Sequence, residues 1–270
     1  MSNPLPTRDI AHLRAHLGVR LERLAADKVR GVLELGSRAR TRDGQVSLGA
    51  LATVVDVAAL FTAKASNPAP QVTSHLALRL PLAPADGRLH TDSSVVRSGR
   101  SGVVSLVHVT DDTGRIVGVA TVTSGALAGA GGSHQPDFQR PDDDFYEPSR
   151  LPGDGPPIDE FLAMSPAGPG RYRMAFHETL RNVNGVLHGG GGALVIEQAA
   201  RHGIADAGGR GAVVDSLDVH FVAPGLVGPF LASVEVVGDG PGPRSAVIEV
   251  VDEGRAGRLV VMGMVGCHGG

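Results

Sequence analysis

Hydrophobic positions recur at three- and four-residue spacing near the start of the chain and form two longer apolar segments further on. Residues 8–30 carry isoleucine and leucine at this spacing with charged residues between them, which predicts an amphipathic helix. Residues 48–65 are almost continuously apolar and end before Asn67-Pro68, so they predict a mostly buried helix. Residues 193–200, after a run of four glycines, predict a second such helix.

β-like runs separated by turn signals follow each of the two buried helices. A short strand precedes each helix, at residues 32–38 and 171–178, and the second is itself preceded by a short segment at 158–164. The breaks between the runs, such as Ala83-Pro84 and Thr113-Gly114, are those of antiparallel strands joined by hairpins. The predicted strands are 71–81, 88–97, 102–111 and 115–124 in the first half, and 212–222, 229–237, 244–251 and 257–266 in the second.

The two halves align with a constant offset, which indicates a tandem duplication. An offset of 141 relates four aligned pairs, namely Asp43 and Asn184, Ser47 and His188, Gly49 and Gly190, and Asp56 and Glu197. Between the halves the composition changes to Gly, Pro, Asp and Ser, which is typical of a linker. We therefore divide the chain into an N-terminal helix (1–30), a first unit (31–127), a linker (128–157) and a second unit (158–270).

A duplicated unit of one helix and one antiparallel sheet predicts a pseudo-dimer of the α+β class, with the two sheets joined and the two helices antiparallel. Glu197 lies nine residues after His188, up to about 13 Å along the helix, too far to act at its own helix N-terminus. Each acid would instead serve the other half's helix. The composite sites are Asn184, His188 and Gly189 with Asp56, and Asp43, Ser47 and Leu48 with Glu197.

A helix N-terminus and a buried carboxylate together suggest acyl chemistry. The glycines after His188 leave bare amides at a helix N-terminus, which suits an anion or a developing oxyanion. Asp56 is flanked by Val55 and Val57, and burial between apolar helices raises the pKa of a carboxyl and makes it a better base. The alternative is structural: a glycine turn before a buried helix, and an acid that only caps or bridges at the pseudo-two-fold axis.

Composition limits which partners, cross-links and metal sites the chain is expected to have. The chain has 270 residues, a formal charge of −3 and 42% hydrophobic residues, which gives no general reason to expect nucleic acid or an anionic membrane as a partner. Cys267 is the single cysteine, so neither an internal disulfide nor a Cys-rich metal site is expected. With no signal-peptide core at the N-terminus, we expect a cytoplasmic location. Asp142-Asp143-Asp144 indicates a solvated linker, and no metal-ligand spacing connects His75, His90, His108, His177, His202 and His220.

The segment Asn184-Gly-Val-Leu-His188-Gly189-Gly190, with Glu197 nine residues after the histidine, resembles the hotdog-fold acyl-CoA thioesterases. The resemblance is to the PaaI-like branch of the 4-hydroxybenzoyl-CoA thioesterase superfamily. The first half keeps the glycines and Asp56 but has Asp43 and Ser47 in place of the Asn and His. The resemblance implies a double hotdog, in which each long helix is wrapped by a curved antiparallel sheet, and an acyl-CoA substrate with no metal or organic cofactor.

The resemblance also implies roles for single residues. Asp56 would be the general base or nucleophile, and the amide of Gly189 would bind the oxyanion. Asn184 would position water or the thioester, and His188 would shape the turn and contact the carbonyl. Substrate contacts would come from Gly190 and from Thr73 and Ser74, which stand where the family tends to have a Ser or Thr near the acid. Glu197 would belong to a second, weaker site.

Two other functions stay open at this point. A hotdog dehydratase or hydratase acting on hydroxyacyl thioesters also uses a His and an acid across an interface, although its Asp-x-x-x-x-His motif is missing here. A non-catalytic acyl-CoA binding protein would bind the same ligand without turnover. The sequence leaves open whether two pseudo-dimers pair into a homodimer, an arrangement common among the proteins it resembles.

Overall fold

One large antiparallel sheet and two long helices form the core of the computed structural model. It describes residues 13–25, 27–67, 69, 71–126, 155–182, 184–209, 213–238 and 244–268. The helices in chain order are α1 (Leu13–His16), α2 (Leu48–Ser66), α3 (Ile158–Leu162) and α4 (Gly189–Asp206), with 3-10 turns at Ser37–Ala39, Glu178–Leu180 and Glu253–Arg255. The strands are β1 (Arg20–Ala25), β2 (Lys28–Glu34), β3 (Gln71–Arg79), β4 (Arg88–Gly99), β5 (Gly102–Thr110), β6 (Ile116–Ala126), β7 (Ser165–Gly168), β8 (Arg171–Met174), β9 (Val213–Phe221), β10 (Phe230–Val237), β11 (Arg244–Asp252) and β12 (Arg258–His268).

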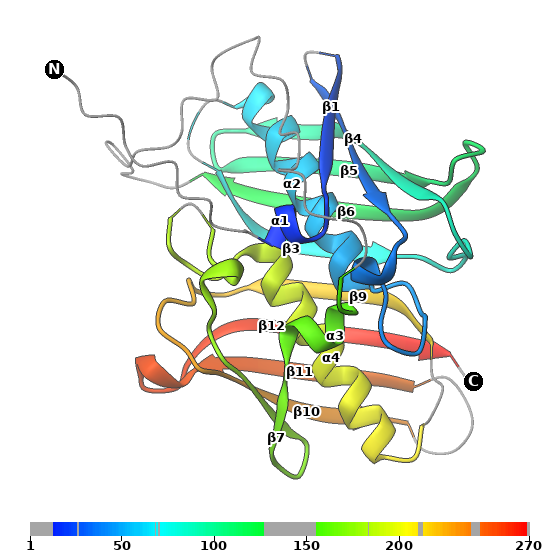
Figure 1. The fold of residues 1–270 in the computed structure, drawn as a ribbon. Coiled ribbons are helices and arrows are strands. Elements are labelled where there is room, and N and C mark those ends of the chain that lie inside the picture. The colour runs from blue at the N-terminus through cyan, green and yellow to red at the C-terminus, as the bar shows by residue number, and fades with distance from the viewer. Residues whose placement is uncertain are drawn as a thin grey trace, which may run out of the picture.

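The twelve strands lie in the order β1-β2-β4-β5-β6-β3-β9-β12-β11-β10-β8-β7. The first half of the chain supplies one side of this sheet and the second half the other (Figure 1). They meet at β3 and β9, which pair antiparallel from His75 opposite His220 to Arg79 opposite Ser216. The predicted joining of the two sheets into one is therefore confirmed, and the architecture is an α+β double hotdog.

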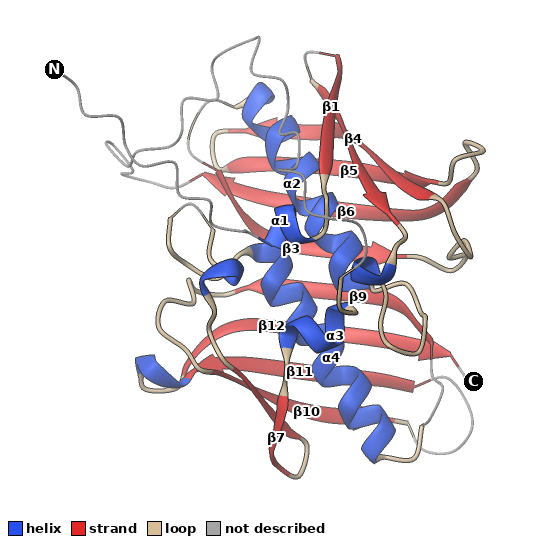
Figure 2. Cartoon of the chain, viewed as in Figure 1, coloured by secondary structure: helices blue, strands red, loops and turns tan. Residues whose placement is uncertain are grey.

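The two long helices lie across one face of the sheet (Figure 2). They run antiparallel with their N-terminal halves side by side, and their C-terminal ends point to opposite ends of the molecule (Figure 1). A Cβ on Gly190 would lie 2.1 Å from Thr53 Oγ1, and a Cβ on Gly49 would lie 2.7 Å from Leu194 Cα. Only glycine at these two positions allows the helices to approach so closely.

This packing corrects our interpretation of the glycine run. The sequence suggested a glycine turn ahead of the helix, but α4 already begins at Gly189. The turn lies earlier, at Gly185, which has a φ of +74°. Glycines 190 to 192 are helical residues against which Thr53, Leu187 and Val261 pack. Close packing, more than a turn, is what these glycines provide.

The apolar character of α2 follows from its place in the core. Ser47 caps its N-terminus by accepting a hydrogen bond from the amide of Ala50, and the helix ends at Asn67. In the part of the chain that the structure describes, α2 is the one helix long and apolar enough to cross a membrane, and 78% of its apolar window is buried inside the protein.

The duplication extends to the hydrogen bonds of the turn before each long helix. In the first half, Arg40 donates to the carbonyl of Gly44, whose φ is +82°. In the second half, Arg181 donates to the carbonyl of Gly185 in the same way. A further repeat occurs in the strands after the helices, since β3 has a bulge between Thr73 and His75, and β9 has one between Val214 and Ser216. These matches support a common origin for the two units.

The predicted N-terminal helix is wrong for most of its length. Residues 8–12 lie outside the described residues, and α1 is a single turn that Gly18, with a φ of +64°, follows. From there the chain forms the β1–β2 hairpin, with Leu17, Val19 and Leu21 all buried. Leucines at positions 13, 17 and 21 fit a period of two as well as a helical period, and Val19 fits only the former.

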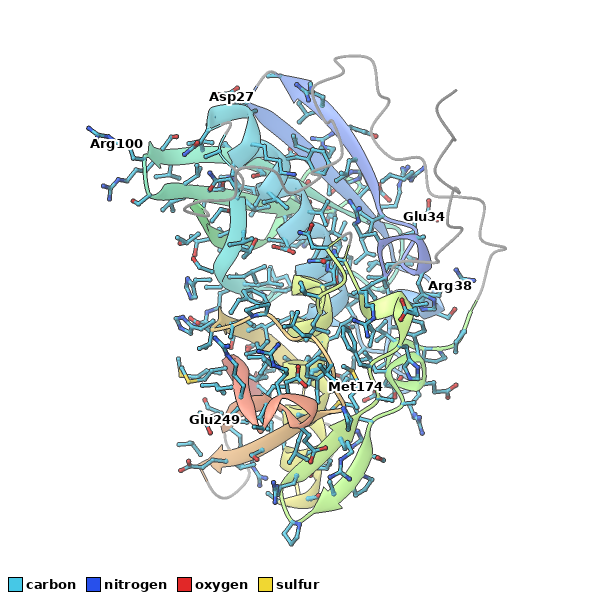
Figure 3. The ribbon with its side chains drawn as sticks, turned by 90° about the vertical axis from the view of Figure 1, so that its left-hand side faces the viewer. Asp27, Glu34, Arg38, Arg100, Met174 and Glu249 are labelled. Carbon is cyan, nitrogen blue, oxygen red and sulfur yellow. The ribbon has the colours of Figure 1, made fainter. Side chains whose placement is uncertain are left out.

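The hairpin moves the boundary of the first unit. The segment α1–β1–β2 matches α3–β7–β8 at the start of the second unit, so the boundary placed after residue 30 falls inside β2. Each hairpin lies on the side of the long helices away from the centre of the sheet, with Asp27 and Glu34 marking the first one in Figure 3. The two short helices meet where the ring of His16 stacks on that of Phe161 at 3.8 Å. Residues 128–154 of the predicted linker lie outside the described residues.

Candidate active site

Asp56 lies at the contact between the two long helices. It sits on α2 and is 6% exposed, and Thr73 at the start of β3 donates a hydrogen bond of 2.5 Å to its Oδ1. Its Oδ2 faces the first residue of α4, since a Cβ on Gly189 would lie 2.7 Å from that oxygen. The predicted pairing of this acid with the helix N-terminus of the other half is what the structure shows.

Burial changes the acidity of this carboxyl. Removal from water raises the pKa of Asp56 to about 6, although the hydrogen bond from Thr73 and the positive charge of Arg14 both act to lower it. A carboxylate with this pKa is largely ionised at neutral pH and is a stronger base than an exposed aspartate. This combination is suited to general base catalysis near pH 7.

The N-terminus of α4 supplies the opposite charge. His188 is the N-cap, is 8% exposed, and accepts a hydrogen bond of 3.0 Å from the amide of Gly190 at its Nδ1. The histidine therefore shapes the first turn of the helix, as the resemblance implied. Among the described residues, the amide of Gly189 donates to no protein acceptor. That amide carries part of the positive end of the helix dipole and is available to an oxyanion.

The matching position in the other half is arranged differently. Glu197 is 0% exposed, and its Oε2 accepts hydrogen bonds from the Ser47 hydroxyl at 2.5 Å and from the Gly49 amide at 2.8 Å. Its Oε1 accepts one from the Leu48 amide at 3.2 Å. The extra methylene of glutamate lets this acid reach the amides that an oxyanion would need. Glu197 therefore caps α2 and occupies the amides that would bind an oxyanion in the second composite site.

Two further differences separate the halves. Arg201 donates to Glu197 Oε1 from both Nε and Nη2 at 3.1 Å, whereas the position 141 residues earlier is Leu60. Val214 stands at the bulge position that Thr73 occupies in the first half, so no hydroxyl from the strand reaches the second acid, whose hydroxyl partner is Ser47 at the start of α2. Arg201 neutralises Glu197 with good geometry, as expected of a structural ion pair. The alignment of the two halves did not single out Arg201, although its position four residues after Glu197 on a predicted helix is a signal for an ion pair.

Three predicted residues have described contacts with residues other than Asp56. Asn184 is exposed, and its amide donates to the side chain of Asn182 within the turn. Ser74 is the extra residue of the β3 bulge, is exposed, and donates to the carbonyl of Thr123. Gly190 is buried against Thr53 between the helices. The catalytic role of Asn184 and the substrate contacts of Ser74 and Gly190 stay predictions.

Asp43, predicted to form the second composite site with Glu197, is not among the hydrogen-bond partners of that acid in the described residues. It is exposed and accepts a hydrogen bond from the hydroxyl of Thr41. Both residues border a cavity of about 670 Å³ on the Glu197 side of the molecule, which is also lined by Gln198, Arg201 and His202. Its lining also includes Ile204, Ala205 and Val214, and Asp56 is not part of it.

Comparisons with known proteins agree on the fold. No protein-family model matches this sequence, and no curated protein matches it either. Among solved structures, the TesB protein of Mycobacterium avium subsp. paratuberculosis is 16% identical, with a TM-score of 0.64 over 96% of this chain and 98% of its own. The acyl-CoA thioesterase II TesB2 of Mycobacterium marinum is 15% identical, with a TM-score of 0.58 over 96% of this chain and 98% of its own.

A third structure, an acyl-ACP thioesterase from Bacteroides thetaiotaomicron, is 15% identical, with a TM-score of 0.59 over 91% of this chain and all of its own. At these identities the likeness shows the shared fold. It extends over both units, so whole double-hotdog chains, and not single hotdogs, are the relevant comparison.

Proposed function

We propose that this protein is a thioester hydrolase that cleaves acyl-CoA to the free acid and CoA at one composite site. The observation that carries the proposal is the buried Asp56 carboxylate facing Gly189, whose amide donates to no described protein acceptor. The site thus combines a base and an oxyanion donor from different halves of the chain. The thioesterase activities named for two of the solved structures that share this fold support it.

The mechanism follows from that geometry. Asp56 takes a proton from a water molecule as the water oxygen adds to the thioester carbonyl carbon. The negative charge that develops on the carbonyl oxygen is stabilised by the Gly189 amide, and one preorganised donor of this kind contributes about 3–4 kcal/mol. When the tetrahedral intermediate collapses, the C–S bond breaks and the proton passes from Asp56 to the thiolate of CoA. Thr73 holds the carboxylate in place through Oδ1.

Direct attack by Asp56 is the second form of this mechanism. The carboxylate oxygen would then bond to the carbonyl carbon and expel the thiolate, and water would hydrolyse the resulting anhydride. In a single turnover in H₂¹⁸O, label in Asp56 identifies the nucleophilic form, because water that attacks the aspartyl carbon of the anhydride leaves its oxygen there, whereas the general-base form never labels Asp56. Neither form needs a metal or an organic cofactor.

The acyl carrier is the main choice within this proposal. One of the matching structures is named for acyl-ACP and another for acyl-CoA. We propose CoA as the carrier and a place in the PaaI-like branch, on the strength of the Asn184-x-x-x-His188-Gly189-Gly190 motif. A cytoplasmic location and pairing into a homodimer belong to the same proposal.

Thiol release from a panel of substrates tests this function. The panel contains short, long and aromatic acyl-CoAs, the same acyl groups on acyl carrier protein, and 3-hydroxyacyl-CoA. We expect free thiol from acyl-CoA and no loss of water from the hydroxyacyl substrate. An enoyl-CoA product would identify a dehydratase instead, and saturable binding of acyl-CoA without thiol release would identify a binding protein.

A further inference from the structure

Two histidines and one aspartate converge on the seam between the two units, at a place the proposed active site does not use. Asp218 Oδ1 lies 2.9 Å from His75 Nε2 and 3.4 Å from His220 Nε2. One nitrogen or oxygen atom from each of the three side chains lies within 4.8 Å of the others. The two imidazole rings stack with their centroids 4.5 Å apart.

The strand register explains why these side chains meet. His75 on β3 is directly opposite His220 on β9, and Asp218 is opposite Ala77. Residues 218 and 220 point to the same face of β9, and the small side chain of Ala77 leaves room for Asp218 to lean toward His75. The histidine spacing along the chain did not reveal this group, because His75 comes from the first half and the other two ligands from the second, and only the pairing of β3 with β9 brings them together.

The face of the sheet is the one away from the helices. Leu76, Leu217 and Val219, which alternate with the three polar residues, are buried in the core. The side chains of His75 and Asp218 are 29% and 25% exposed, and that of His220 is 47% exposed. A small ion in solution therefore has direct access to the group, whereas Thr73 and Asp56 lie on the inner side of β3.

We propose that His75, Asp218 and His220 bind a divalent transition-metal ion of the Zn²⁺ type. Imidazole nitrogen and carboxylate oxygen are preferred ligands of this class. With bonds of about 2.0–2.2 Å, neighbouring ligands of a tetrahedral zinc ion are about 3.3 Å apart. The measured separations of 2.9 and 3.4 Å from Asp218 Oδ1 are close to that spacing, so small rotations of the three side chains suffice. Water would complete the coordination.

Such an ion would connect the two units. β3 belongs to the first unit and β9 to the second, and their pairing is the junction of the continuous sheet (Figure 1). A ligand that binds the folded state and not the separated strands stabilises the fold by an amount that grows with the logarithm of its free concentration above the Kd. The ion is therefore expected to stabilise the pairing of β3 with β9. Hydrolysis at Asp56 proceeds without the ion.

The test uses tag-free, chelator-treated full-length protein and titrates Zn²⁺ by calorimetry and by thermal unfolding. We expect saturable binding of one ion per chain and a Tm that rises with the logarithm of free Zn²⁺. Co²⁺ should give d–d absorption bands that report coordination by nitrogen and oxygen. Mg²⁺, which prefers six oxygen ligands, should produce neither effect.

His220→Ala and Asp218→Asn should abolish the binding and the shift in Tm. The matched control is His268→Ala, since His268 forms a 2.9 Å pair with Asp215 on the same face but has no described third ligand. The proposal is overturned if Zn²⁺ fails to bind, or if His220→Ala binds it as the parent does. Thioester hydrolysis is measured in parallel and should not change with Zn²⁺ removal, so failure of the metal site and failure of the proposed function give different results.

Discussion

Asp56 Oδ2 faces the N-terminal residue of the other unit's helix, Gly189, but does not accept a hydrogen bond from its amide in the described structure. Glu197, at the matching position, instead accepts hydrogen bonds from both Leu48 and Gly49. The side chain of Glu197 is one methylene longer than that of Asp56. The shorter one leaves the helix N-terminus available to a substrate, and the longer one occupies it, so the duplication has produced one open site and one closed site.

The pH dependence of stability should report the buried acid. The pKa of folded Asp56 is about 6, above its unfolded value of roughly 3.9. The folded state therefore holds this proton more tightly, and its contribution to stability is complete below about pH 4 and is lost as the pH rises through 6. Asparagine does not ionise, so the Asp56→Asn variant does not lose this stability as the pH rises. Relative to the parent, it should gain on the order of 2–3 kcal/mol between pH 4 and pH 8.

Urea unfolding of the two proteins at pH 4 and pH 8 measures that gain. A difference between parent and Asp56→Asn that is the same at both pH values would show that the carboxyl of Asp56 is not buried as described.

Removing the hydroxyl of Thr73 should shift the pH–rate profile. The hydrogen bond that Thr73 donates lowers the pKa of Asp56, so Thr73→Val should move the acidic limb of kcat/KM to higher pH and reduce the rate at pH 7. Thr73→Ser should restore the parent profile. Thr62→Val is the control, because Thr62 is also buried and its hydroxyl donates to the carbonyl of Ala58 within α2. Equal profiles for Thr73→Val and the parent would remove Thr73 from the site.

A methyl group on Gly189 should damage the site selectively. The added Cβ would lie 2.7 Å from Asp56 Oδ2 and would push the carboxylate out of position. We expect Gly189→Ala to lower kcat/KM about a hundredfold, since misplacement of about 1 Å has this effect in other enzymes. Gly191→Ala, two residues on, has its tightest contact with the flexible end of Leu187 at 3.2 Å and ordinary contacts with Leu180 at 3.8 Å, and should keep its activity. Equal activity in both variants would contradict the placement of Gly189.

Glu197 should matter for stability. Gln at this position would leave Arg201, whose side chain is 13% exposed, without its charge partner. Loss of one member of a buried ion pair costs roughly 3–5 kcal/mol, so Glu197→Gln should lower the free energy of unfolding by about that amount. Arg201→Leu in the same chain, which reproduces the Leu60 of the other half, should recover part of it.

The control for this experiment is an exposed pair. Glu34 forms an ion pair with Arg20, and their side chains are 65% and 42% exposed. Glu34→Gln should change the free energy of unfolding by no more than about 1 kcal/mol. A change as small in Glu197→Gln would mean that the second acid is not structural.

The sequence was informative where local pattern and duplication agreed. Eight predicted strands and two buried helices correspond to β3–β6, β9–β12, α2 and α4, because hairpin signals and the offset of 141 restricted both halves at once. The pairing of Asp56 with Gly189 followed from the length of a helix and the symmetry of a duplication. The N-terminal segment was misassigned because leucines at positions 13, 17 and 21 satisfy two periods, and Gly18 decided between them.

The sequence did not predict that the second site, at Glu197, is closed. The sequence shows that Glu197 is one methylene longer than Asp56, but only the packing of α2 against α4 shows that it reaches the amides of residues 48 and 49. The same holds for Val214 in place of Thr73, which depends on the position of a β-bulge. Side-chain reach across an interface and strand register are properties of the tertiary structure.

In the proposed mechanism a single acid, Asp56, carries the hydrolysis. The most direct measurement compares thiol release from acyl-CoA by Asp56→Asn, Glu197→Gln and the parent, each at a temperature where circular dichroism shows it folded. We predict that kcat falls by at least about a hundredfold in Asp56→Asn, since general base catalysis contributes 10²–10⁴, and changes less than about threefold in Glu197→Gln. Full activity in Asp56→Asn together with loss of activity in Glu197→Gln would place the active site at Glu197 and would exclude Asp56 as the catalytic acid residue.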